Sequence, residues 1–196
     1  ELKKTEELDW LRENLDEACR QYGFVGFVLL DRTGVQIAAL LDAPIGRKDL
    51  MKLSDFFSRS LNGETVVSLP FLSEVSLPDG RGNWSEDLAT MFSSTPIYKN
   101  GKVVAVLAFR LRPETQYSNI LSLGHTGRTG ETYSFDGEGN LLSDSRFKEM
   151  LKDIGLLSPY DSNAILKFRI KDPGGNLLKE FSPETSSEVW PLTRMA

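Results

Sequence analysis

The residue with the most telling chemistry in this sequence is Arg110, near the end of the apolar run 103–111. In an extended strand, alternate side chains share a face, so Arg110 would lie on a mostly apolar face. The opposite face is apolar too, so we expect this strand to be covered on both sides. A guanidinium there needs an acidic partner, a cluster of carbonyl groups or an anionic ligand, because an unpaired buried charge is costly. An ion pair with Asp87 or Glu86, or an exit to solvent at the strand end, is the simpler alternative.

No pattern of catalytic or metal-binding residues accompanies Arg110. His125 is the only histidine and Cys19 the only cysteine, so the chain has no intramolecular disulfide and no metal-ligand spacing. The glycines at 124, 127 and 130 lack the lysine and the strand-then-helix context of a phosphate loop. We therefore expect this segment not to be an enzyme and to carry no cofactor and no metal.

Composition narrows the class of protein further. The 196 residues are 40% hydrophobic, with a formal net charge of −5, which argues against a nucleic-acid surface. No apolar run approaches the roughly 20 residues that span a bilayer. The sequence starts at Glu1 and its first methionine is Met51, so we expect it to have lost a leader or to belong to a longer protein.

Three turn motifs predict the strands that position Arg110. Asn100-Gly101 favours a tight hairpin turn between the two strands of 91–111. An Asp-x-x-Gly turn joins two further strands at Asp31 to Gly34, and the same pattern returns at Asp136 to Gly139. Two copies of one strand-turn-strand unit indicate two related modules in tandem.

The first helix carries one narrow apolar seam and is predicted to end at Gly23. The seam has a 3,4,3,4 spacing and consists of Leu8, Leu11, Leu15, Ala18 and Tyr22. It can pack on the module's own sheet, or it can form a parallel dimer seam leading to a membrane-spanning helix; both hold if the helix has two apolar sides. A second helix is predicted over 47–61, with Asn62-Gly63 as its stop.

These motifs together resemble the double Cache sensor domains of bacterial transmembrane receptors. The resemblance rests on the N-terminal helix, the Asp-x-x-Gly hairpin, the stretch PIYKNGKVVAVL at 96–107 and the run GRTGETY at 127–133. Such domains are PAS-like and extracytoplasmic, periplasmic or extracellular, and belong to histidine kinases, chemoreceptors, cyclases or serine/threonine kinases. The full-length protein would then carry an output domain, while this segment is the sensor part of an inner-membrane protein.

The resemblance implies an α+β fold with a long N-terminal helix and a PAS-like antiparallel sheet, followed by a second, smaller and incomplete PAS-like module. The expected boundaries are 1–23 for the N-terminal helix, 24–112 for the membrane-distal ligand-binding module, 113–126 for a connecting helix and 127–196 for the membrane-proximal module. We expect the last to be truncated, because it lacks a counterpart of the 91–111 hairpin.

The irregular segment 65–88 is where the resemblance places the ligand. So long a connection is usually functional, and in a PAS-like fold it closes a small-molecule pocket. The alternative is a plain Ω-loop held by its own aromatic residues.

The amino-acid-binding branch of these sensors holds the ligand's ammonium group with an Asp near the end of the last hairpin strand, where this sequence has Arg110. That branch also has an Arg-x-Trp followed by an aromatic residue, whereas the run at 81–85 is RGNWS, one residue too long and without the aromatic. Both departures argue against an α-amino-acid sensor. They favour a small ligand with a carboxylate or another anionic group.

The expected site therefore centres on Arg110, with apolar walls from Trp84, Phe92 and Phe71, and with Ser94 and Asp87 completing the set. The expected partners are a small-molecule ligand and a second copy of the chain through the N-terminal helix, with no nucleic acid and with the membrane reached only through flanking segments. The competing hypothesis is a non-catalytic dimerisation or scaffold domain of a membrane protein. A scaffold would show an exposed apolar patch and no cavity beneath 65–88.

Overall fold

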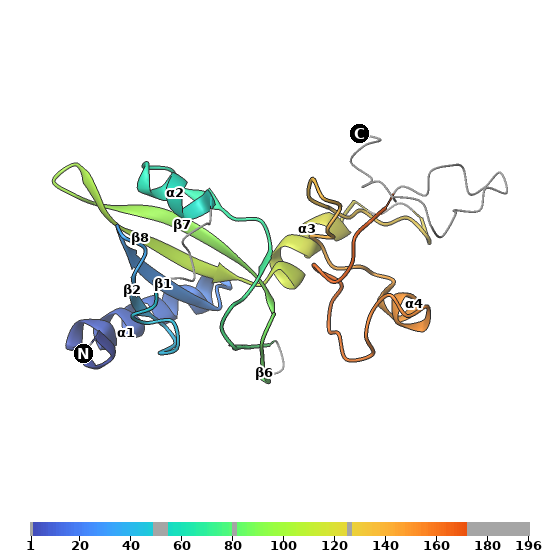
Figure 1. Ribbon diagram of the computed structural model, residues 1–196, viewed down its shortest axis with the longest axis horizontal. Coiled ribbons are helices and arrows are strands. Elements are labelled where there is room, and N and C mark those ends of the chain that lie inside the picture. Colours follow the sequence, from blue (N-terminus) through green and yellow to red (C-terminus); the bar gives the residue numbers. More distant parts are fainter. Residues whose placement is uncertain (1, 49–54, 80–81, 125–126, 172–196) are drawn as a thin grey trace. The chain divides into compact units, whose positions relative to one another are not determined.

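The computed structural model describes residues 2–48, 55–79, 82–124 and 127–171. The chain divides into two compact units, Glu1–Arg112 and Pro113–Ala196, and each is described by itself (Figure 1). Among the described residues, none of the helices combines the length and the hydropathy that a membrane span requires.

An antiparallel sheet with the strand order β2-β1-β8-β7-β3 forms the first unit, and β4 also pairs with β7. A separate two-stranded sheet pairs β5 with β6. The strands are β1 (Gly26–Asp31), β2 (Gln36–Ala39), β3 (Val66–Val67), β4 (Phe71–Leu72), β5 (Leu77–Pro78), β6 (Trp84–Ser85), β7 (Ala89–Lys99) and β8 (Lys102–Leu111). With the N-terminal helix, this sheet confirms the expected α+β class.

Helices cover both faces of the sheet, as the apolar alternation of β8 predicts. The helix α1 (Glu6–Tyr22) follows the short 3₁₀ turn η1 (Leu2–Lys4) and contacts β1 and β2. The helix α2 (Asp55–Leu61) contacts β7 and β8 from the other side (Figure 1). The sheet therefore has one face against α1 and one against α2 and the segments that follow it.

The apolar seam of α1 packs on the unit's own sheet, which is the first of the two interpretations above. Leu8 is buried, and Leu11 and Leu15 pack against the same core. In the last turn Cys19 is buried, whereas Tyr22 is 65% exposed. The helix ends at Gly23 as predicted, with a left-handed φ of 75° that glycine adopts without strain.

The second helix is shorter at its start than predicted. Leu50 and Leu53, on which part of the 47–61 prediction rested, lie outside the described residues. Arg47 is not helical, because its carbonyl accepts the amide proton of Gln36 at 2.9 Å. The predicted stop is confirmed, since Gly63 has a φ of 98°.

All three predicted turns are present. Asn100 and Gly101 both have positive φ, 51° and 74°, as a tight hairpin turn of this kind requires. Asp31 Oδ1 accepts the amide protons of Thr33 and Val35 at 2.8 and 3.0 Å. Asp136 Oδ1 accepts two amide protons at the same offsets, from Glu138 and Asn140, both at 2.9 Å. The repeated motif is thus one turn used once in each unit.

The second unit contains a π-helical turn η2 (Pro113–Tyr117) and the helices α3 (Ser118–Ser122) and α4 (Lys148–Asp153). The strand pair expected around the Asp136 to Gly139 turn is reduced, in the part of the chain that the structure describes, to one bridge between Phe135 and Leu141. The ladder stops there because the Ser134 amide donates to the Ser143 side chain, at 3.0 Å, instead of to a backbone carbonyl. A small core of Leu141, Leu157 and Ala164 holds the unit together.

Candidate functional site

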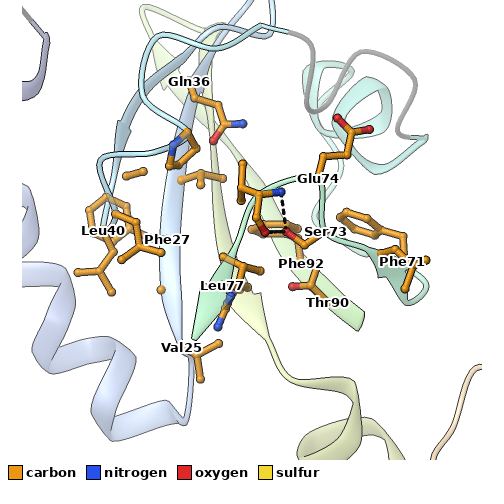
Figure 2. Close-up of a pocket in the computed structure, with 18 residues that line it drawn as sticks. Val25, Phe27, Gln36, Leu40, Phe71, Ser73, Glu74, Leu77, Thr90 and Phe92 are labelled. Carbon is orange, nitrogen blue, oxygen red and sulfur yellow. Dashed lines mark hydrogen bonds between the residues drawn. The ribbon is translucent and has the colours of Figure 1, made fainter. Parts of the chain in front are cut away.

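A pocket of about 100 Å³ lies on the sheet face opposite α1 (Figure 2). Strands β1, β2, β7 and β8 form its floor, and residues 71–75 and 77 form the wall facing them. One water needs roughly 10–15 Å³ by a comparable measure, so the pocket has room for a small molecule. It lies at the first part of the irregular segment 65–88.

Three of the six predicted site residues line this pocket, namely Arg110, Phe71 and Phe92. Arg110 is 8% exposed and Phe92 is 6% exposed, so both belong to the interior. The backbone explains their convergence, because Phe92 on β7 lies directly opposite Arg110 on β8. The Arg110 side chain is not a free cation, since it interacts with other groups of the protein.

The structure places the other three predicted residues outside the pocket lining. Trp84 is 60% exposed on β6, and Asp87 is exposed in the following loop with a left-handed φ of 54°. Ser94 is fully buried, but its hydroxyl meets Ser60 Oγ at 2.8 Å and the Val66 carbonyl at 3.3 Å. It fastens α2 and β3 to β7.

Stacked phenylalanines build one wall of the pocket. The ring centroids of Phe56, Phe71 and Phe92 lie 5.8 to 6.3 Å apart in all three pairs, with interplanar angles between 20° and 25°. Aromatic pairs at such distances contribute roughly 0.5–1.5 kcal/mol beyond the area they bury. Helix α2, which carries Phe56, therefore supports the pocket wall although it does not line the cavity.

Two buried polar atoms in the lining have no hydrogen-bond partner among the residues that the structure describes. They are Gln36 Oε1 and Thr90 Oγ1, on side chains that are 1% and 3% exposed. Neither residue was predicted as a site residue from the sequence. Gln36 carried the same signal as Arg110, a polar side chain in an apolar strand, but Thr90 offered none.

The carboxyl groups whose pKa is lowered, Asp31, Asp42 and Asp136, lie outside the pocket lining. Burial raises the pKa of Asp31, but the hydrogen bonds from Thr33 and Val35 outweigh it, so the pKa is lowered. The pKa of Asp136 is lowered in the same way, against burial, by Asn140 and Glu138. Burial and the nearby Asp16 carboxylate raise the pKa of the Cys19 thiol, against a hydrogen bond from the Gly26 backbone. In the described part of the chain, no three His, Cys, Asp or Glu side chains converge as a metal site requires.

A second, polar pocket of about 220 Å³ lies in the second unit, lined by Ser118, Ser122, Glu131, Thr132, Asp144 and Arg146. Its carboxylates already hold the local backbone. Glu131 accepts from the Ser145 hydroxyl at 2.8 Å and from the Arg146 amide at 2.7 Å. Asp144 accepts the amide proton of Ala164 and pairs with Lys148. The pocket of the first unit is therefore the stronger candidate.

Comparison with solved structures finds the same fold in ligand-binding domains of chemoreceptors. The sensory domain of Campylobacter jejuni chemoreceptor Tlp3 with isoleucine bound has a TM-score of 0.52 and 21% identity over 75% of this chain and 55% of that one. The Tlp3 domain with 4-methylisoleucine has a TM-score of 0.51 and 22% identity over 81% and 57%. The complex with L-norvaline has a TM-score of 0.52 and 20% identity over 81% and 56%.

At these identities the likeness concerns the fold, and the chain spans little more than half the length of those domains. No family model and no curated protein matches the sequence. The expected resemblance is confirmed at the level of architecture: the chain has the fold of Cache-type sensor domains.

Proposed function

We propose that this chain is the extracytoplasmic small-molecule sensor domain of a transmembrane signalling receptor, and that the segment itself is not catalytic. The observation that carries the proposal is the pocket of the first unit, where the buried Arg110 faces an otherwise largely apolar lining. Such a cavity, apolar with a few placed polar groups, is typical of small-molecule sites. The fold shared with chemoreceptor ligand-binding domains supports the same role.

The ligand we propose is a small molecule with a carboxylate or another compact anionic group. A guanidinium presents a planar fork that matches a carboxylate, and a charge-assisted pair is strongest where water is excluded. The amino acids named in the Tlp3 complexes also carry a carboxylate. An α-ammonium group would meet the Arg110 cation, so we propose that this pocket does not select for one.

The sensor would signal only if the ligand binds one arrangement of the unit better than another. The pocket and helix α1 lie on opposite faces of the same two strands. Strands β1 and β2 line the pocket on one face and contact α1 on the other. A receptor homodimer through α1 would use the helix face away from the sheet, where Trp10 is 62% exposed. The shared strands support a signalling route in which ligand binding shifts β1 and β2, these strands shift α1, and α1 passes the change toward the membrane.

A thermal-shift screen against small carboxylates tests the proposal. A ligand at about a hundred times its dissociation constant stabilises the folded state by about 2.7 kcal/mol. For a hit, Arg110→Ala should weaken binding roughly 10- to 100-fold, because a charge-assisted hydrogen bond contributes about 1.5–3 kcal/mol. Calorimetric titration measures the loss.

Arg20→Ala is the matched control, since Arg20 is a surface arginine paired with Asp16 on α1. Arg110→Lys keeps the charge without the planar fork and guards against a variant that merely fails to fold. Unchanged affinity in Arg110→Ala would refute the anion site. A screen without any hit would favour the dimerisation or scaffold alternative.

A further inference from the structure

Gln36 and Arg110 lie at two separate ends of the pocket. Gln36 lies opposite Leu30 of β1, whereas Arg110 lies opposite Gly26 of the same strand. These two positions of β1 are four residues apart, about 13 Å along a strand. Thr90 lies toward the Arg110 end, because it comes two residues before Phe92, the β7 partner of Arg110. Figure 2 shows this order, with Gln36 at one end and Thr90 toward the other.

Gln36 has a buried acceptor atom with nothing to accept. Its side chain is 1% exposed, and Oε1 has no partner among the described residues. An amide oxygen can only accept hydrogen bonds. Leaving such an atom buried and unsatisfied costs folding free energy, and folded proteins leave few of them. An acceptor at the edge of a cavity is satisfied when a donor enters the cavity.

The backbone holds Gln36 in place for this role. Its amide proton goes to the Arg47 carbonyl at 2.9 Å, and its own carbonyl accepts from the Gly46 amide at 2.8 Å. Both hydrogen bonds join β2 to the loop that follows it. These backbone bonds fix the position of Gln36 in the strand, and the Oε1 atom takes no part in them.

We infer that Gln36 is the second recognition residue of this pocket, and that it selects ligands carrying a hydrogen-bond donor at the end remote from the anion. The inference rests on the proposed function, in which Arg110 holds the anionic end. The ligand class is then a short carboxylate with a hydroxyl, amide or amine group several atoms away, and with an apolar middle against Val28, Ala39 and Phe92. A plain fatty acid of the same length would leave Gln36 unsatisfied.

Matched probes test the inference. Butanoate and pentanoate are titrated calorimetrically into the purified chain beside 4-hydroxybutanoate and 5-hydroxypentanoate. We expect a hydroxylated probe to bind the wild type at least roughly tenfold more tightly than its parent, because the new bond also satisfies a buried acceptor. Gln36→Leu should erase that preference, so that the hydroxylated acid and its parent bind this variant with dissociation constants within about twofold of each other. Gln21→Leu, at an exposed position of α1, should preserve the preference.

The stability of the Gln36→Leu variant to urea, measured without any of the four acids, is the second test of the inference. Gln36→Leu removes the unsatisfied Oε1 acceptor and leaves an apolar side chain of similar size, so the urea midpoint should stay equal or rise. A clearly lower midpoint would mean that Gln36 makes a structural hydrogen bond, and it would overturn the inference.

The remaining outcomes separate the two proposals. Equal binding of hydroxylated and parent acids to the wild type, or a preference that survives in Gln36→Leu, overturns the role of Gln36 and leaves the anion site standing. Failure of all four acids to bind the wild type counts against the proposed function and takes the inference with it.

Discussion

Single side chains in this protein divide into those that line the pocket and those that hold its walls. Arg110 and Ser94 lie on the same face of the same sheet, two strand positions apart in the β7–β8 ladder. Arg110 reaches the cavity, whereas Ser94 sits under α2 and bonds to Ser60. The face of the sheet on which a residue lies therefore does not decide whether it lines the pocket. The covering element that it contacts decides this.

Ser94→Ala should lower the free energy of unfolding by about 1–2 kcal/mol, because it leaves the Ser60 hydroxyl buried without its partner. Urea denaturation followed by tryptophan fluorescence measures the change. Ser58→Ala, on the exposed side of α2, is the matched control and should stay within about 0.5 kcal/mol of wild type. Ligand affinity should not change in either variant, and a selective loss in Ser94→Ala would return Ser94 to the binding site.

At the scale of elements, the β7–β8 hairpin supplies both the Phe92 wall and the Arg110 anchor. Its register follows from the tight turn at Asn100 and Gly101, and one irregularity lies between Ile97 and Tyr98. A slip by one residue would move Arg110 to the opposite face of the sheet. The turn therefore controls the site although it lies at the far end of both strands.

Gly101→Val should destabilise the unit by about 1–2 kcal/mol, since Gly101 has a φ of 74° that a branched side chain tolerates poorly. No other atom lies near enough to clash with an added Cβ, so the cost comes from the backbone alone. Urea denaturation measures it. Lys102→Ala, at the adjacent exposed position, is the control, and an equal loss there would contradict the backbone explanation.

At the scale of the whole molecule, each unit has its own core and its own Asp-x-x-Gly turn. Asp31 serves the first unit and Asp136 the second, with the same pattern of amide donors. The folded-state pKa of each carboxyl lies below its ordinary value. The charged form is thus the one that stabilises both turns.

Stability should therefore fall in acid. A carboxyl with a lowered folded-state pKa contributes in full above its unfolded pKa, near 3.9, and loses the contribution as pH drops through the folded value. Urea midpoints measured from pH 7 to pH 2.5 should decline below about pH 4. Asp31→Asn and Asp136→Asn should each lower the midpoint at pH 7 and flatten part of this decline.

Glu17→Gln, on the exposed side of α1, is the control for these two variants and should leave the profile unchanged. An acid profile in either Asp variant that matches wild type throughout would contradict the role of these turns.

Local chemistry explains what the sequence predicted well. Asn-Gly and Asp-x-x-Gly turns depend on a few adjacent residues, so Asn100, Asp31 and Asp136 were identified without any tertiary information. The end of α1 at Gly23 is equally local. Alternation along β8 predicted that both faces are covered, and the burial of Ala105 and Val106 on opposite faces agrees.

Tertiary packing decided the rest. Phe92 and Arg110 lie opposite each other within one hairpin, so their pairing was predictable from the sequence. The order of strands from different hairpins depends on long-range contacts. The position of Gln36 on β2, two strands away from Arg110, was therefore not predictable. Trp84 resembled a wall residue in the sequence, yet the short β5–β6 pair leaves it on the surface. The sequence by itself determined the turns, the helix seam and the presence of a cation in an apolar strand. Only the tertiary structure decided which side chains meet in the cavity, because that depends on contacts between segments distant in the chain.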